Sequence, residues 1–177
     1  MKHFAIIGNP VKHSLSPALH NWVFKSLNIQ AIYKKISVEE EVLPDIIQQM
    51  KNGILDGFNI TIPHKENIMK FVDEINPRAK NIASVNCIIK SNSRIIGNNT
   101  DWFGFTMALK NNEIDPSGKE VIVLGAGGTA KSILFSLKQL GAKKIIILNR
   151  THQKARALQD KIIISYSLEN AESILKN

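Results

Sequence analysis

The sequence predicts an α/β protein with mostly parallel strands, built as two domains. Strand-like apolar runs alternate with helix-like periodic segments along most of the 177 residues, a pattern typical of parallel sheets. In the second half, a glycine-rich turn joins a buried-type strand to an amphipathic helix. Between the halves, residues 111–120 are polar and contain Pro116 and Gly118, which indicates a domain boundary close to this stretch.

Eight strands and six helices are expected in this order. The strands cover residues 4–8, 31–36, 57–62, 85–89, 94–97, 121–124, 144–148 and 162–164. The helices cover residues 17–27, 43–51, 64–72, 101–110, 129–140 and 153–160. With 44% hydrophobic residues the chain can bury one core or two small ones, so length alone does not decide the number of domains.

Composition narrows the classes of function. The 23 Lys and Arg against 15 Asp and Glu give a net charge of +8, but these cations are spread along the chain and aromatic residues are only 6%. Small anionic ligands are therefore favoured over nucleic acid or a membrane surface. No apolar run approaches the roughly 20 residues of a membrane span, which predicts a cytoplasmic protein.

Metal sites and disulfides are not expected. The single cysteine, Cys87, excludes an internal disulfide and any Cys-rich metal cluster. His13 and His20 have no cysteine or acidic partner at ligand spacing, so they do not predict a metal site.

The first helix starts at a motif with two interpretations. Ser16 precedes Pro17, which is the signature of an N-cap residue followed by proline in the first helical position. Ser16 then has only a structural role. A helix amino terminus flanked by Ser14 and Ser16 is also a natural site for a carboxylate, and the sequence leaves both interpretations open.

The stretch NITIPHK, which begins at Asn59, combines a strand with a turn. Two-residue alternation places Asn59 and Thr61 on one side of the sheet. Pro63 ends the strand, and the helix expected after it carries Lys65 in its first turn, where the positive helix end disfavours a cation. A solvent-facing helix lysine is the structural alternative. Polar segments also lie at other strand ends, at residues 9–21, 84–87 and 97–104, and such ends converge on one crevice in open α/β sheets.

The second half contains a dinucleotide-binding pattern. Gly125, Gly127 and Ala130 match G-x-G-x-x-A between two buried-type strands, where glycines permit a tight turn and close approach of a pyrophosphate to the backbone. The expected contacts in this turn are Gly125, Ala126, Gly127, Gly128, Thr129 and Ala130. A purely structural glycine turn is the alternative interpretation.

The end of the next strand favours NADP over NAD. An NAD site expects an acidic residue there, whereas this chain has Asn149, Arg150 and Thr151. Arg150 can form paired hydrogen bonds to a 2′-phosphate, and Lys154 adds a second positive charge. The alternative is that both are ordinary solvated surface cations.

Taken together, these motifs resemble the shikimate dehydrogenase family. The similarity rests on the order and spacing of SLSPALHN, NITIPHK, SVNC, NNTDWFG, GAGGTAKS and NRT, and it runs from residue 6 to about residue 155. The resemblance implies an NADP-dependent, reversible reduction of 3-dehydroshikimate to shikimate in aromatic amino acid biosynthesis. It also implies a substrate-binding α/β domain at 1–105 and a partial Rossmann-type NADP-binding domain at 106–177.

The resemblance also implies roles for individual residues. Ser14 and Ser16 would hold the substrate carboxylate, and the ring hydroxyl groups would be bound by Asn59, Thr61, Asn86 and Asp101. Lys65 and Asp101 would form the catalytic pair. Hydride delivery to a ketone leaves an alkoxide that needs a proton and positive charge, and an ammonium group supplies both.

The length of the chain leaves a second hypothesis. From residue 121 onward about three strands are expected, against the six of a full doubly wound sheet, so the chain is expected to be truncated at its C-terminus. The alternative function is therefore a non-catalytic module that binds shikimate or quinate. An apolar sheet edge left by missing strands would favour association, which makes a homodimer possible.

Overall fold

The computed structural model describes residues 1–175 and divides the chain into two compact units, Met1–Thr100 and Asp101–Asn177. The division follows Thr100, five residues before the boundary drawn from the sequence (105 − 100 = 5). Both units contain strands and helices in alternation, so the predicted α/β class is confirmed. None of the helices in residues 1–175 has the length and hydropathy that crossing a bilayer requires.

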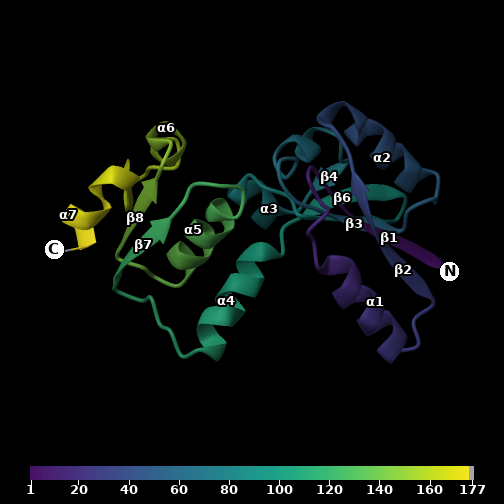
Figure 1. The fold of residues 1–177 in the computed structure, drawn as a ribbon, viewed down its shortest axis with the longest axis horizontal. Coiled ribbons are helices and arrows are strands. Elements are labelled where there is room, and N and C mark those ends of the chain that lie inside the picture. The colour runs from purple at the N-terminus through teal and green to yellow at the C-terminus, as the bar shows by residue number, and fades with distance from the viewer. Residues whose placement is uncertain (176–177) are drawn as a thin grey trace. The chain divides into compact units, whose positions relative to one another are not determined.

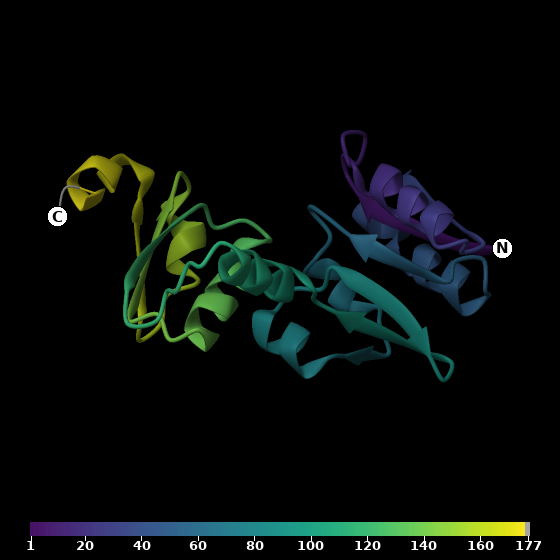
Figure 2. The ribbon, with the colours of Figure 1, turned by 90° about the horizontal axis from the view of Figure 1, so that it is seen from below.

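The first unit is built on a six-stranded sheet with the strand order β2-β1-β3-β5-β6-β4. The strands are β1 (Lys2–Gly8), β2 (Ala31–Ser37), β3 (Gly57–Ile60), β4 (Glu74–Ile75), β5 (Cys87–Ser91) and β6 (Arg94–Asn98). β1 runs parallel to β2 and β3, and β4 runs parallel to β6. β5 is antiparallel to both of its neighbours, β3 and β6. It is joined to β6 in a hairpin (Figure 2), and the tip residues Asn92 and Ser93 have positive φ.

Helices cover both faces of this sheet. They are α1 (Ser16–Ser26), η1 (Glu40–Val42), α2 (Leu43–Lys51), η2 (Asn67–Lys70) and α3 (Pro77–Ile82), with α1 and α2 on opposite sides of the strands (Figure 1). The alternation within β1 sends Ala5 and Ile7 into the main core under α2, and Ile6 into a smaller core with Tyr33. α2 buries Leu43, Ile46, Ile47 and Met50 in the main core. Burial of each such side chain contributes about 1.5–3 kcal/mol to the free energy of folding.

The second unit contains a three-stranded parallel sheet with the order β7-β8-β9. Its elements are α4 (Asp101–Asn111), β7 (Glu120–Leu124), α5 (Ala130–Gln139), β8 (Lys144–Asn149), α6 (His152–Arg156), β9 (Ile163–Ser167), η3 (Leu168–Asn170) and α7 (Ala171–Leu175). Leu134 and Leu137 of α5 pack in a core with Ile145 and Ile147 of β8. The Ser136 hydroxyl donates to the carbonyl oxygen of Trp102 at 2.8 Å and so links α5 to α4.

The helix expected at residues 64–72 is wrong. Residues after β3 form turns, followed by the short 3₁₀ segment η2. The carbonyl of Lys65 accepts a hydrogen bond from the Val85 amide at 2.8 Å, and the Met69 amide donates to Glu66 instead. The bond that would continue an α-helix from Lys65 is thus replaced by a tertiary one.

The start of α1 also differs from the prediction, and α3, like β4 and α7, was not predicted. α1 begins at Ser16 itself, Leu15 precedes it, and no side chain caps the helix, so Ser16 is not the N-cap. α3 was not expected, although Asn76 caps it by accepting the Arg78 amide at 3.0 Å, with Pro77 in the first position. This Asn-Pro pair is the signal that could have revealed α3.

Candidate functional site

Two of the predicted polar residues of the first unit, Asn59 and Asn86, meet at one edge of its sheet, where β3 ends and β5 begins. Asn59 pairs with Cys87 across β3 and β5, so the end of β3 lies beside the start of β5. Because β5 is reversed, Asn86 reaches this edge by preceding its strand rather than by following it. β6 runs in the same direction as β3, and its end brings Thr100 to the same edge.

Hydrogen bonds connect the asparagines of this edge. The side-chain nitrogen of Asn59 donates to the backbone carbonyl oxygen of Asn86 at 3.2 Å. The side-chain oxygen of Asn86 accepts a hydrogen bond from the backbone amide of Thr100 at 2.8 Å. The side-chain nitrogen of Asn86 donates to the Thr100 hydroxyl at 3.1 Å. Asn86 is 8% exposed, and it holds the residue that directly precedes Asp101.

Thr61 is fixed by close backbone packing. Its amide donates to the Ile7 carbonyl at 2.8 Å, which extends the pairing of β3 with β1 by one step. A Cβ atom at Gly8 would lie only 2.4 Å from the Thr61 methyl carbon. Glycine at position 8 is therefore required for Thr61 to lie where it does.

Lys65 is buried, with 8% of its surface exposed, so it is not a solvent-facing helix lysine. The expected helix end does not act on its charge, because no α-helix begins there. Its neighbour His64 is 1% exposed, and the Nε2 atom of His64 lies 2.8 Å from the Val38 carbonyl oxygen. The turn that carries Lys65 is thus held by Val38 on one side and, through the Lys65 carbonyl, by Val85 on the other.

Ser14 and Ser16 form a separate pair at the start of α1. Their hydroxyl oxygens are 3.2 Å apart, and the Ser16 amide donates to the Ser14 hydroxyl at 3.3 Å. Both side chains are half-buried. Asp101 is the first residue of α4 and belongs to the second unit, whereas Lys65 belongs to the first.

A pocket of about 160 Å³ lies beside the glycine turn of the second unit. It is lined by Ala126, Gly127, Asn149, Arg150, Thr151 and Lys154, all of which the sequence assigned to a cofactor. Gly125 adopts φ +103°, a conformation that favours glycine, and its amide donates to the Leu148 carbonyl at 2.7 Å. The turn is therefore fastened to the end of β8.

The charge of this pocket suits an anion. None of its six lining residues is acidic, and both Arg150 and Lys154 are exposed. α5 begins directly after the turn, at Ala130, and its first turn carries no acidic residue. The positive end of a helix favours a phosphate at this place.

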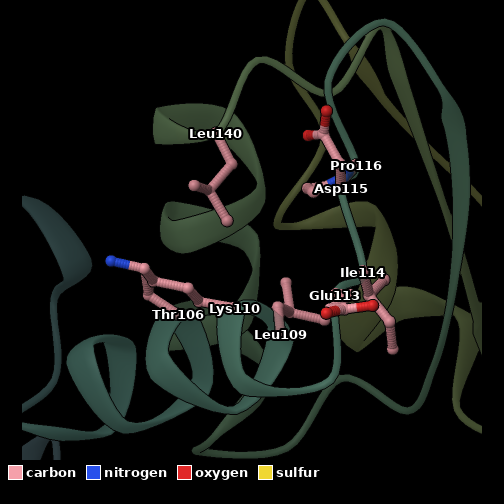
Figure 3. Close-up of a pocket in the computed structure, with 8 residues that line it drawn as sticks. All are labelled: Thr106, Leu109, Lys110, Glu113, Ile114, Asp115, Pro116 and Leu140. Carbon is pink, nitrogen blue, oxygen red and sulfur yellow. The ribbon is translucent and has the colours of Figure 1, made fainter.

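Two further pockets are present, one in each unit. One, of about 350 Å³, lies where the side chains of Leu109 and Leu140 approach each other, while the Lys110 ammonium points away from Glu113 (Figure 3). In the sequence, part of this segment indicated only a boundary loop. Another, of about 250 Å³, lies on the α1 face of the first sheet, and its lining includes Asn59 and Cys87. Burial raises the pKa of the Cys87 thiol.

A metal centre finds no support in residues 1–175. No cluster of three or more His, Cys, Asp or Glu side chains in that range could hold a metal ion.

Two family models match the chain. The model described as "Shikimate dehydrogenase substrate binding domain" matches residues 6–88, and the one described as "Shikimate / quinate 5-dehydrogenase" matches residues 106–177. The shikimate dehydrogenase (NADP(+)) of Bacillus cereus (strain G9842) is 44% identical over 174 residues, which covers 95% of this chain and 63% of that relative. The chain thus spans about three fifths of the length of this curated relative.

Solved structures give the same result. The shikimate dehydrogenase of Aquifex aeolicus has a TM-score of 0.89 at 32% identity, covering 99% of this chain and 65% of that chain. The shikimate 5-dehydrogenase of Thermus thermophilus, in complex with NADP(H) and shikimate, has a TM-score of 0.86 at 35% identity, covering 98% of this chain and 66% of that chain.

Proposed function

We propose, from the premise that the chain belongs to the shikimate dehydrogenase family, that it acts in the NADP-dependent, reversible reduction of 3-dehydroshikimate to shikimate. The observation that carries the proposal is the burial of Lys65, at 8% exposure, on the segment that directly follows β3. A lysine is rarely buried in this way without a specific role, and a positioned ammonium can both donate a proton and stabilise an alkoxide.

Lys65 is the proposed acid and base. NADPH, when bound, supplies the hydride to the carbonyl carbon of 3-dehydroshikimate. The Lys65 ammonium then gives a proton to the resulting alkoxide oxygen, and in the oxidative direction a neutral Lys65 takes the proton from the alcohol. Asp101 is proposed as its catalytic partner.

The substrate contacts follow the chemistry of the side chains. Asn59, Thr61 and Asn86 offer amide and hydroxyl groups suited to ring hydroxyls, and Asp101 offers an acceptor. The two neighbouring hydroxyl groups of Ser14 and Ser16, 3.2 Å apart, are proposed to bind the substrate carboxylate.

The cofactor is proposed to be NADP. Arg150 and Lys154 line the pocket beside the glycine turn, and their charges suit a 2′-phosphate. The Bacillus cereus relative is named for NADP(+), and the Thermus thermophilus structure is described in complex with NADP(H) and shikimate. Both support the proposal for this chain. A homodimer and a cytoplasmic location remain predictions from the sequence.

The alternative is a module that binds shikimate or quinate without turnover, and one experiment separates the two functions. Oxidation of shikimate by NADP⁺ is followed at 340 nm on the 177-residue chain, with calorimetry for shikimate binding in parallel. Turnover that is lost in Lys65→Ala supports the dehydrogenase, whereas binding without turnover supports the module. Lys70→Ala is the matched control, because the Lys70 side chain is 66% exposed on η2 and its removal should leave turnover unchanged.

A chain that neither binds shikimate nor turns it over would contradict both functions.

A further inference from the structure

Tyr33 of β2 contacts one of the proposed substrate residues. Its hydroxyl donates a hydrogen bond to the side-chain oxygen of Asn59 at 2.7 Å. Tyr33 is 4% exposed, and burial, with a smaller effect of Cys87, raises the pKa of its hydroxyl. The phenol therefore stays protonated and available as a donor at neutral pH.

α1 holds Tyr33 in place at both its backbone and its ring. The Asn21 side chain accepts from the Tyr33 amide at 2.8 Å and donates to the Tyr33 carbonyl at 2.9 Å. The imidazole of His20 stacks on the phenol ring, with centroids 4.3 Å apart and an angle of 6° between the planes. The hydroxyl thus projects toward Asn59 from a side chain that has little freedom to move.

The hydrogen bonds of Asn59 define which way its amide faces. The Asn86 carbonyl is only an acceptor, so the group 3.2 Å from it must be the Asn59 nitrogen. The Asn59 oxygen then faces Tyr33, whose hydroxyl must donate. A flipped amide would place two oxygens against each other at Asn86. One N–H and one lone pair of Asn59 remain for a ligand.

We propose that Tyr33 is a positioning residue that holds the Asn59 amide in the orientation needed to bind a substrate hydroxyl. The inference rests on the proposed function, because Asn59 is assigned to the substrate there. Tyr33 acts through Asn59 and does not itself react. His20 and Asn21 act one step further back, by holding Tyr33.

Tyr33→Phe tests the proposal, because it removes the hydroxyl and keeps the ring stack and both backbone bonds. We expect the Kd for shikimate, measured by calorimetry on the 177-residue chain, to rise about three- to tenfold, as one orienting hydrogen bond is lost. The Kd for NADP⁺ should not change. Tyr166→Phe, an exposed tyrosine of β9, is the control and should bind shikimate as the wild type does.

A double-mutant cycle separates positioning from a general effect on the fold. In an Asn59→Ala background, Tyr33→Phe should have no further effect on the Kd for shikimate. An unchanged Kd in the single variant, or the same loss with and without Asn59, would overturn the proposal.

A direct readout of Asn59 keeps the inference distinct from the proposed function. In ¹⁵N spectra, the side-chain amide signals of Asn59 should shift and exchange faster with solvent in Tyr33→Phe than in the wild type. If the wild type binds no shikimate, the proposed function fails, and these signals alone decide whether Tyr33 positions the amide. Unchanged Asn59 signals would contradict the positioning role.

Discussion

The side-chain oxygen of Asn149 accepts a hydrogen bond from the backbone amide of Ala126 at 3.1 Å. The nitrogen of the same side chain donates to the Thr151 carbonyl at 2.8 Å. One amide thereby ties the glycine turn to the loop that carries Arg150. A carboxylate at position 149 could replace only the first of these bonds, since it has no donor. Asn149 therefore connects the two sides of the pocket without adding a negative charge that would repel an anion.

Arg150→Ala is expected to weaken NADP⁺ binding by about ten- to a hundredfold, the size of a lost hydrogen-bonding contact with a charged group. NAD⁺ binding should change little, because it lacks the 2′-phosphate. Calorimetry with both cofactors gives the comparison. Arg156→Ala, on α6 but outside the lining of the pocket, should bind both cofactors like the wild type. Equal losses for NADP⁺ and NAD⁺ in Arg150→Ala would remove the argument for a 2′-phosphate site.

Gly127→Ala should separate cofactor binding from folding. No atom lies within 4 Å of a Cβ built at Gly127, so the fold itself has room for alanine. We expect an unchanged melting temperature and a weaker affinity for NADP⁺, because the methyl group keeps the pyrophosphate from the backbone. Gly104→Ala is the matched control: it also has open space, lies in α4, and should raise stability without changing NADP⁺ binding. Unchanged NADP⁺ affinity in Gly127→Ala would place the phosphates elsewhere.

Gly8→Ala should destabilise the first unit. The new Cβ would lie 2.4 Å from the Thr61 methyl carbon and 2.8 Å from the Ile62 carbonyl oxygen, and the backbone contact cannot be relieved by a rotamer change. We expect a loss of about 1–3 kcal/mol in the free energy of unfolding, measured by urea denaturation. Adding Thr61→Ser removes the methyl group and should restore part of the loss. A Gly8→Ala variant as stable as the wild type would contradict the close packing.

The carboxylate of Asp73 gives a pH-dependent prediction. The carboxylate accepts a hydrogen bond from the Ile95 amide at 2.8 Å and forms an ion pair with Lys51 at 3.1 Å. Both interactions, the bond from Ile95 more strongly, lower the pKa of Asp73 below the ordinary value of 3.8. A carboxyl group whose pKa is lowered by folding stabilises the folded state in full when the pH is above its pKa in the unfolded chain. This stabilisation is lost as the pH falls through the pKa of the folded state. Asp73→Asn should therefore lower the urea midpoint at pH 7, with a smaller difference at pH 3. An equal difference at both pH values would show that the charge has no part in it.

The second half of the chain was predicted well because its signals are local. The strands expected at 121–124 and 144–148 correspond to β7 and β8, and the intervening helix to α5, since buried apolar runs and a glycine turn lie within 30 residues of one another. The six residues that line the cofactor pocket were likewise named from the sequence. Their binding of NADP remains a prediction.

The first half was predicted less well because distant residues decide its local structure. The Val85 amide donates to the Lys65 carbonyl, which in a helix would accept a bond from within the helix. No residue close to Lys65 in the sequence predicts this partner. The hydrogen bond between Tyr33 and Asn59 likewise joins residues 26 positions apart. The burial of Lys65 follows from such tertiary contacts, so the sequence could name the residue but not its surroundings.

The reversed direction of β5 has a practical consequence for handling the protein. The β5–β6 hairpin places Asn86 and Thr100 at one end and its exposed tip, Asn92 and Ser93, at the other. Five residues of strand separate the two ends, a span of about 15 Å. The tip is thus a suitable place to insert a fluorophore or an affinity tag, because it is distant from Asn86, which is proposed to bind the substrate.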